Sequence, residues 1–138
     1  MRLLSSFLVL ALVLGACSSS RHAKGPGLGG RWELSLFPGS DKTFDEIFTQ
    51  RRPELVLDAK KGTVTGTTGC NQLSGSFTVI NDRLSFGSNI VTTRMACPGY
   101  EERTFLDALG RINHYRVNET QLSLLHDSTV VMSFTRKP

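Results

Sequence analysis

Residues 54–86 read ELVLDAKKGTVTGTTGCNQLSGSFTVINDRLSF, and this stretch decides the fold class. It consists of short runs rich in β-branched and aromatic residues, a composition that favours strands. The runs are Glu54–Asp58, Thr63–Thr67, Gly75–Ile80 and Arg83–Phe86. Lys60-Lys61-Gly62 and Asn81-Asp82 are typical of the turns that join antiparallel strands. The stretch therefore predicts a series of antiparallel strands.

The same pattern continues on both sides of this stretch. Apolar and polar residues alternate over Arg31–Phe37, which predicts a strand there. Three more strands are predicted near the C-terminus, at Tyr115–Val117, Gln121–Leu125 and Val130–Thr135. We therefore predict an α+β fold: a mostly antiparallel β-sheet of about seven or eight strands, strongly curved or barrel-like, with one amphipathic helix.

The predicted helix begins near Glu101 and Glu102. Phe105 and Leu109 recur at helical spacing, and the two glutamates place negative charge where the helix dipole favours it. A shorter apolar repeat within Asp41–Gln50 predicts one or two helical turns inside a long loop.

The N-terminus has the layout of an export signal. Arg2 precedes the uncharged run Leu3–Leu14, which is about twelve residues long and too short to span a membrane, since a spanning helix needs roughly twenty residues. Leu14-Gly15-Ala16-Cys17 then resembles the lipobox of bacterial lipoproteins, in which the cysteine receives a diacylglycerol and becomes the first mature residue. The alternative is an ordinary secretory signal with a free Cys17, an exposed thiol that lipidation would consume.

These features predict three parts of the chain. Residues 1–16 are a lipoprotein signal peptide, residues 17–29 are the lipidated cysteine and a flexible tether rich in Ser, Gly and Pro, and residues 30–138 are one domain. A tether of this length has an average reach of about 20 Å, so we expect the domain to lie close to a membrane. Ser18 is not the aspartate that retains enteric lipoproteins at the inner membrane, so we expect the outer membrane, facing the periplasm.

Charge and cysteine content limit the partners. Without Arg2, fifteen Lys and Arg residues face twelve Asp and Glu residues, and no basic run is interleaved with aromatics, so nucleic acid is not an expected partner. We expect a monomer. If Cys17 is lipidated, Cys70 and Cys97 remain, and an even pair in an exported protein indicates a disulfide. Closing that loop would stabilise the fold by roughly 3.5 kcal/mol.

No arrangement of residues predicts catalysis or a cofactor. His22, His114 and His126 have no partner at metal-ligand spacing, and the cysteines are not in a C-x-x-C motif. Glu101 and Glu102 are adjacent helical residues that point in different directions, so we interpret them as helix-start charge and not as an acid/base pair. The sequence lacks nucleophile-elbow, phosphate-loop and dinucleotide motifs, so we predict neither an enzyme nor a cofactor.

Two motifs stand out in the middle of the domain: Gly66-Thr67-Thr68-Gly69-Cys70-Asn71, followed by Gly75 and Phe77, and Thr92-Thr93-Arg94-Met95-Ala96-Cys97. Sparser landmarks accompany them, namely Trp32, Leu84, Phe86, Phe105, Leu109, Leu122 and Leu124. With these residues the domain resembles the META domain family of HslJ-like envelope lipoproteins. The resemblance implies a disulfide between the motif cysteines and an exported or membrane-anchored protein. Some members are linked to heat shock, novobiocin resistance, motility or virulence, and no agreed activity comes with the family.

Within the motifs, Arg94 is the strongest candidate for binding. Its forked guanidinium, beside the hydroxyls of Thr92 and Thr93, suits a carboxylate or a phosphate, and Asn71 is a further candidate. The alternative is that Arg94 ties its segment to nearby carbonyls or to an acidic side chain. Gly69 and Gly75 are expected in backbone conformations closed to other residues.

The sequence thus favours a non-enzymatic binding or stress-response module on the cell envelope. A small-ligand carrier is a second hypothesis, because curled antiparallel sheets often hold a pocket. A hydrolase is the third.

Overall fold

The computed structural model describes residues 27–38 and 40–138. The predicted signal peptide, the predicted lipidation site Cys17 and residues 18–26 of the predicted tether lie outside these described residues. Within the described part, no helix has the length and apolar character needed to cross a membrane.

Nine strands and two helices form in the described residues. In chain order they are β1 (Gly30–Leu36), α1 (Phe44–Ile47), β2 (Glu54–Asp58), β3 (Thr63–Thr67), β4 (Gln72–Ile80), β5 (Arg83–Phe86), β6 (Val91–Thr92), α2 (Glu102–Gly110), β7 (His114–Val117), β8 (Gln121–His126) and β9 (Thr129–Lys137).

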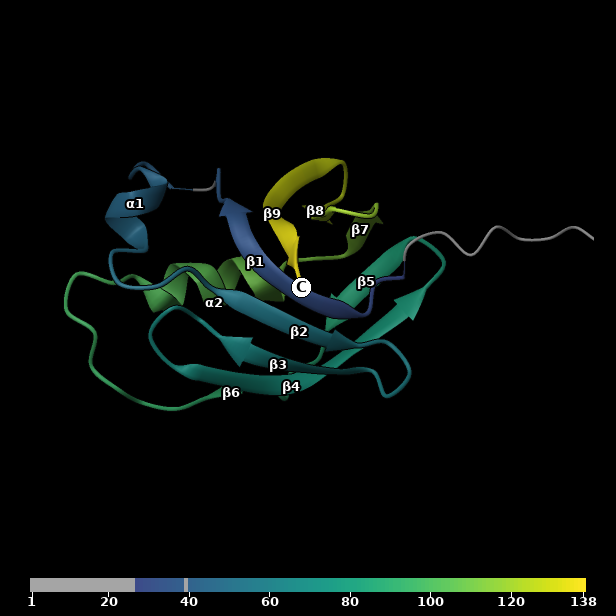
Figure 1. Cartoon of the computed structure of the whole chain (residues 1–138), viewed down its shortest axis with the longest axis horizontal. Helices are drawn as coiled ribbons and strands as arrows, with labels where there is room; N and C mark the ends of the chain where they lie inside the picture. The colour runs from purple at the N-terminus through teal and green to yellow at the C-terminus, as the bar shows by residue number, and fades with distance from the viewer. Residues whose placement is uncertain (1–26, 39) are drawn as a thin grey trace, which may run out of the picture.

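The strands form one curled antiparallel sheet. Its order is β5-β4-β3-β2-β1-β9-β8-β7, and β6 pairs with β4 beside this path. Figure 1 shows β1 to β4 lying side by side and the sheet curling around α2. The architecture is a half-barrel, which confirms the predicted fold class; the helix α1 adds one short turn to the single long helix.

Local sequence signals located most of the strands. The bounds of β2, β3 and β5 are those expected from the runs and turns of residues 54–86. Asn81, in the predicted turn between β4 and β5, has a positive φ of 58°. The sequence did not indicate β6, because two residues are too few to show an alternating pattern and its pairing with Leu73 and Ser74 is not local.

The core lies between the sheet and α2. Trp32, Phe105 and Phe134 are the largest fully buried side chains, and they come from β1, α2 and β9. Helix α2 turns Phe105, Ala108 and Leu109 inward. These side chains fill the interior of the half-barrel.

The N-terminal end of the described chain packs against the domain. Leu28 lies within the predicted tether and is 6% exposed, and its carbonyl accepts a hydrogen bond from Trp32 Nε1 at 2.9 Å. The Arg136 guanidinium donates to the carbonyls of Gly29 (3.0 Å) and Gly27 (2.9 Å) and lies over the Trp32 ring. The main-chain carbonyls of residues 27–29 are therefore held to the domain by the Trp32 and Arg136 side chains.

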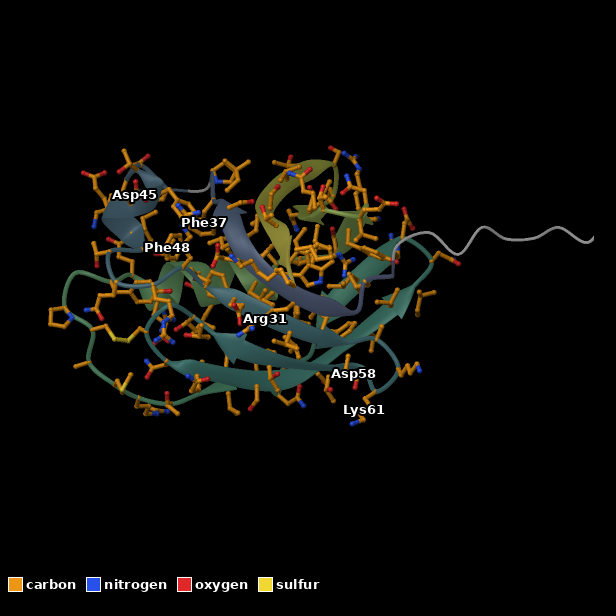
Figure 2. The ribbon with its side chains drawn as sticks, in the orientation of Figure 1. Arg31, Phe37, Asp45, Phe48, Asp58 and Lys61 are labelled. Carbon is orange, nitrogen blue, oxygen red and sulfur yellow. A yellow bond between two sulfur atoms is a disulfide. The ribbon has the colours of Figure 1, made fainter. Side chains whose placement is uncertain are left out.

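The loop between β1 and β2 contains the helical turn expected within Asp41–Gln50. Helix α1 starts with a capping box, in which the Glu46 carboxylate accepts bonds from the Thr43 amide and hydroxyl, both at 2.7 Å. These bonds hold the pKa of Glu46 below its ordinary value. Behind the helix, Phe48 packs against Phe37 at a ring distance of 5.8 Å, as Figure 2 shows.

The two end strands of the curled sheet, β5 and β7, are joined by main-chain hydrogen bonds. The Leu84 amide donates to the Asn113 carbonyl (3.3 Å), and the Tyr115 amide donates to the Asp82 carbonyl (3.1 Å). We call this contact the seam. β5 and β6 both pair with β4 on the same side. In contrast to β5, β6 has no strand on its outer side among the described residues.

Candidate binding site

The two sequence motifs meet at Asn71. This residue is 1% exposed, and its Oδ1 accepts hydrogen bonds from the Met95 amide (2.7 Å) and the Thr93 hydroxyl (2.9 Å). Its Nδ2 donates to the Met95 carbonyl (3.3 Å) and to the Glu102 carboxylate (3.0 Å). Asn71 was predicted as a possible binding residue; in the structure its amide is fully occupied in joining the second motif and α2 to the first motif.

The turn that holds Asn71 is itself tightly constrained. The Thr68 hydroxyl accepts a bond from the Asn71 amide (2.9 Å) and donates to Glu102 (2.5 Å). Gly69 has the expected positive φ, 98°, and a side chain there would collide with the Arg51 carbonyl. The same expectation was wrong for Gly75, which lies in β4 without a positive φ and leaves room for Ile90. The Tyr100 hydroxyl donates to the Thr68 carbonyl, and burial raises the pKa of Tyr100.

A disulfide completes the link between the motifs. Cys70 and Cys97 are joined, with their Cα atoms 6.0 Å apart. The bond is drawn in yellow in Figure 2. Together with Asn71 it holds residues 93–97 in place, although this segment follows a strand of only two residues.

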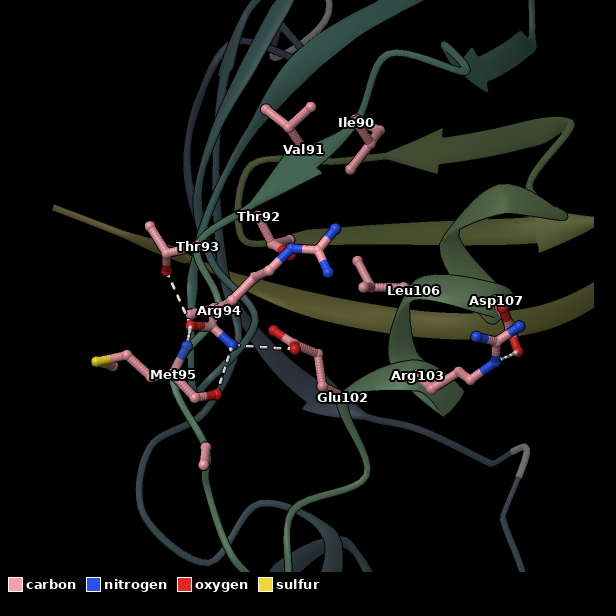
Figure 3. Close-up of a pocket in the computed structure, with 12 residues that line it drawn as sticks. Ile90, Val91, Thr92, Thr93, Arg94, Met95, Glu102, Arg103, Leu106 and Asp107 are labelled. Carbon is pink, nitrogen blue, oxygen red and sulfur yellow. Dashed lines mark hydrogen bonds and ion pairs between the residues drawn. The ribbon is translucent and has the colours of Figure 1, made fainter.

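An open groove of about 740 Å³ lies between this held segment and α2. Its lining residues are Asn71, Ile90–Ala96, Glu102, Arg103, Leu106 and Asp107. Figure 3 shows residues 90–95 forming one wall and Leu106 and its helical neighbours forming the other. An adjoining depression of about 220 Å³ extends the groove over Phe86, Ile90 and Leu109.

Arg94 extends across this groove. Its side chain runs from the strand wall toward the helix, as seen in Figure 3. Among the described residues its guanidinium has no hydrogen bond and no ion pair, in contrast to the alternative that it ties its segment to a carbonyl or to an acidic group. The other predicted binding residues, Thr92, Thr93 and Asn71, also line the groove.

The remaining charged groups of the groove are engaged. Glu102 accepts bonds from Thr68 and Asn71, and Arg103 pairs with Asp107 at 3.7 Å along the helix. Arg94 is therefore the cation of the groove that pairs with no described neighbour, and Glu102, an anion of the same groove, is hydrogen-bonded to the neutral Thr68 and Asn71. A carboxylate or a phosphate suits a free, forked guanidinium because both accept two parallel hydrogen bonds.

Other residues singled out in the sequence have structural positions. The Thr93 hydroxyl bridges strand and turn, since it donates to Asn71 and accepts from the Gln72 amide at 3.0 Å. Glu101 pairs with Lys42, which holds the pKa of Glu101 below its ordinary value. Within the part of the chain that the structure describes, no three His, Cys, Asp or Glu residues cluster as metal ligands would.

Glu102 is the residue of this site whose role the sequence did not reveal. It was interpreted only as charge at a helix start, yet its carboxylate joins the helix to Thr68 and Asn71. The one available signal was its position three residues before the buried Phe105, which orients it toward the same side of the helix.

Comparisons with known proteins agree with this architecture. The model of the META domain matches residues 27–138. An NMR structure of a protein from Burkholderia xenovorans is similar, with 28% identity, a TM-score of 0.59 and coverage of 78% of this chain and 81% of that chain. A DUF4847 family protein from Bacteroides vulgatus has the same fold at 13% identity, with a TM-score of 0.58 and coverage of 79% and 93%. No curated protein matches the chain.

Proposed function

Because the chain belongs to the META domain family, we propose that it is a cell-envelope lipoprotein whose domain is a non-enzymatic binding module with Arg94 as its anion-binding residue. The ligand presents a carboxylate or a phosphate to the groove between residues 90–96 and α2.

One observation carries this proposal, namely the free guanidinium of Arg94 in a groove whose other cation, Arg103, pairs with Asp107. Hydrogen bonds to charged groups are worth about 1.5–3 kcal/mol each, so a bidentate anion supplies a useful part of a binding free energy. Neither Glu102 nor Asp107 pairs with Arg94: Glu102 accepts bonds from Thr68 and Asn71, and Asp107 pairs with Arg103. The guanidinium of Arg94 is thus available to a negatively charged ligand.

The packing of the domain favours this groove over an enclosed cavity. Trp32, Phe105 and Phe134 fill the space that a carrier of the barrel type would use for its ligand. A ligand therefore binds at the surface, along α2. The Glu102 carboxylate is held in hydrogen bonds to Thr68 and Asn71, which favours a binding role of the groove over acid/base chemistry.

The place of action follows from the N-terminal sequence. Fatty acyl chains on Cys17 hold the module at a membrane, and we place it at the outer membrane, facing the periplasm, because Ser18 follows the cysteine. Mass spectrometry of the chain extracted from membranes tests this: an acylated Cys17 at the N-terminus is expected. An unmodified cysteine, or a Cys17→Ala chain that stays in the membrane fraction, contradicts it.

A titration tests the anion site. We expect glutarate or inorganic phosphate, added to the detergent-solubilised chain, to shift the Nε–H NMR resonance of Arg94. Arg94→Gln should abolish binding of the probe. Arg116→Gln is the matched control, because Arg116 is an exposed arginine on β7 that does not line the groove, and it should bind like the wild type. An Arg94 resonance that neither probe shifts at millimolar concentration would refute the proposal.

A further inference from the structure

The outer edge of β6 presents unpaired main-chain groups. β6 pairs with β4 through Leu73–Thr92 and Ser74–Val91, and the Thr93 amide donates to the Gln72 carbonyl at 3.0 Å. In an antiparallel pair, successive residues direct their N–H and C=O groups to opposite sides. Val91 and Thr93 therefore face β4, whereas Thr92 and the residue after Thr93 face away from it.

The outward groups belong to Thr92 and Arg94. Among the described residues, no hydrogen bond is formed by the main-chain N–H or C=O of either residue beyond the ladder to β4. The neighbouring strand β5 differs, because its outer side is occupied by the seam with β7. We call the outward main-chain groups of Thr92 and Arg94 the open edge, and both residues line the groove.

The groove beside this edge has the surfaces that an added strand needs. Alternate side chains of a strand point to opposite faces. On the inner face, Ile90 and Leu106 line the groove, and the depression over Phe86 and Leu109 adjoins it. On the outer face, Val91 is 61% exposed and Met95 is 63% exposed. An extended chain paired with Thr92 and Arg94 would place apolar side chains against both faces.

Charge selects the kind of chain. Arg94 is the uncompensated cation of the groove, and its side chain leaves the same residue whose main chain is unpaired. A segment that pairs with Arg94 through its backbone brings a neighbouring acidic side chain within reach of the guanidinium. The complementary ligand is therefore both extended and acidic.

We propose that the β6 edge accepts an extended, acidic segment of another polypeptide as an additional antiparallel or parallel strand, held by main-chain hydrogen bonds to Thr92 and Arg94 and by a carboxylate on the Arg94 guanidinium. The proposal rests on the proposed function and names its ligand class. It predicts a backbone-mediated contact, which a small anion cannot make.

The test begins with a displayed library of random decapeptides selected on the immobilised full chain in detergent. Arg94→Gln is selected in parallel. We expect the wild type to enrich peptides that contain Asp or Glu within an apolar segment, and the variant to lose the acidic preference.

Synthetic versions of an enriched peptide then report on the backbone. Methylation of peptide amides that face β6 should abolish binding, and methylation of the alternate amides should leave it unchanged, because only every second amide of a strand faces its partner. Amide exchange of Thr92 and Arg94 should slow roughly tenfold or more on binding. The Tyr115 amide, at the seam, is the internal control and should not change.

The outcomes distinguish strand addition at β6 from anion binding by Arg94. Peptides that bind without protecting Thr92 and Arg94, or without the alternating effect of methylation, overturn strand addition and leave the anion site standing. The same holds if glutarate shifts the Arg94 resonance but no peptide is enriched. If neither probe binds, both proposals fall. Concentration-dependent protection of these amides in the chain alone would identify a second copy as the occupant and also overturn the proposal.

Discussion

The seam and the open edge lie next to each other on the same side of β4, yet they are built differently. At the seam, main-chain groups of β5 and its turn bond directly to the segment that forms β7. At the open edge, β6 is two residues long, and the chain beyond it is held by the bonds between Thr93 and Gln72, by the Asn71 side chain and by the disulfide. The comparison teaches that a strand edge remains accessible when side chains and the inner strand β4, and not a strand on the outer side, fix its position.

This difference also separates stability from binding. Asn71, which holds residues 93–95 of the groove wall through hydrogen bonds, is buried, and its amide group is fully bonded. Arg94 faces the groove and has no partner among the described residues. Substitution of Asn71 should therefore change the free energy of unfolding, and substitution of Arg94 should change ligand binding.

The largest expected effect comes from removing the disulfide. For Cys70→Ser combined with Cys97→Ser, the free energy of unfolding should fall by roughly 3.5 kcal/mol, because a long loop of the unfolded chain is no longer closed. Urea unfolding measures the loss. Amide exchange should accelerate at Met95 and stay unchanged at Tyr115. Equal acceleration at both amides would show that the open edge and the seam are not held independently.

The second test compares two asparagines. Asn71→Ala removes a buried side chain and its bonds to Met95, Thr93 and Glu102, and should cost about 2–3 kcal/mol of unfolding free energy. Asn113→Ala is the matched variant at the seam, where the side chain bonds to Asp127, and should cost about 1 kcal/mol. Equal costs in chemical denaturation would contradict the view that one asparagine positions the groove wall.

The third test uses pH at the base of the groove wall. Burial raises the pKa of Tyr100, so the folded protein favours the neutral phenol. The associated stability is fully present below the unfolded pKa of about 10 and decreases as the pH rises above that value. Tyr100→Phe should cost about 1 kcal/mol at neutral pH through the lost bond to Thr68 and should unfold with a weaker alkaline dependence. Parallel alkaline curves for the two proteins would exclude this contribution.

The smallest expected effect on stability belongs to Arg94. Arg94→Gln should change the free energy of unfolding by less than about 0.5 kcal/mol, because no described contact is lost. Arg136→Gln is the contrasting variant, since its guanidinium bonds to Gly27, Gly29 and Glu119, and it should cost about 1–3 kcal/mol. If thermal unfolding shows equal losses, Arg94 has the structural role that was the alternative at the outset.

Much of the candidate site was visible in the sequence as residues but not as an arrangement. Arg94 and Thr92 were recognised from their functional groups, and both line the groove. Asn71 was recognised too, but its buried contacts to Met95 and Glu102 depend on segments 24 and 31 residues away. No local pattern encodes such distances, so its structural role could not be predicted.

The sequence by itself determined the strands and their turns. Alternation within β2, β3 and β5 and the turn residues between them act over a few positions, which is why their bounds were predictable. Only the tertiary structure decided that β5 meets β7, that β6 keeps a free edge and that α2 lies opposite Arg94. Those features depend on how a twisted sheet curls around its core, which is set by packing among residues far apart in the chain.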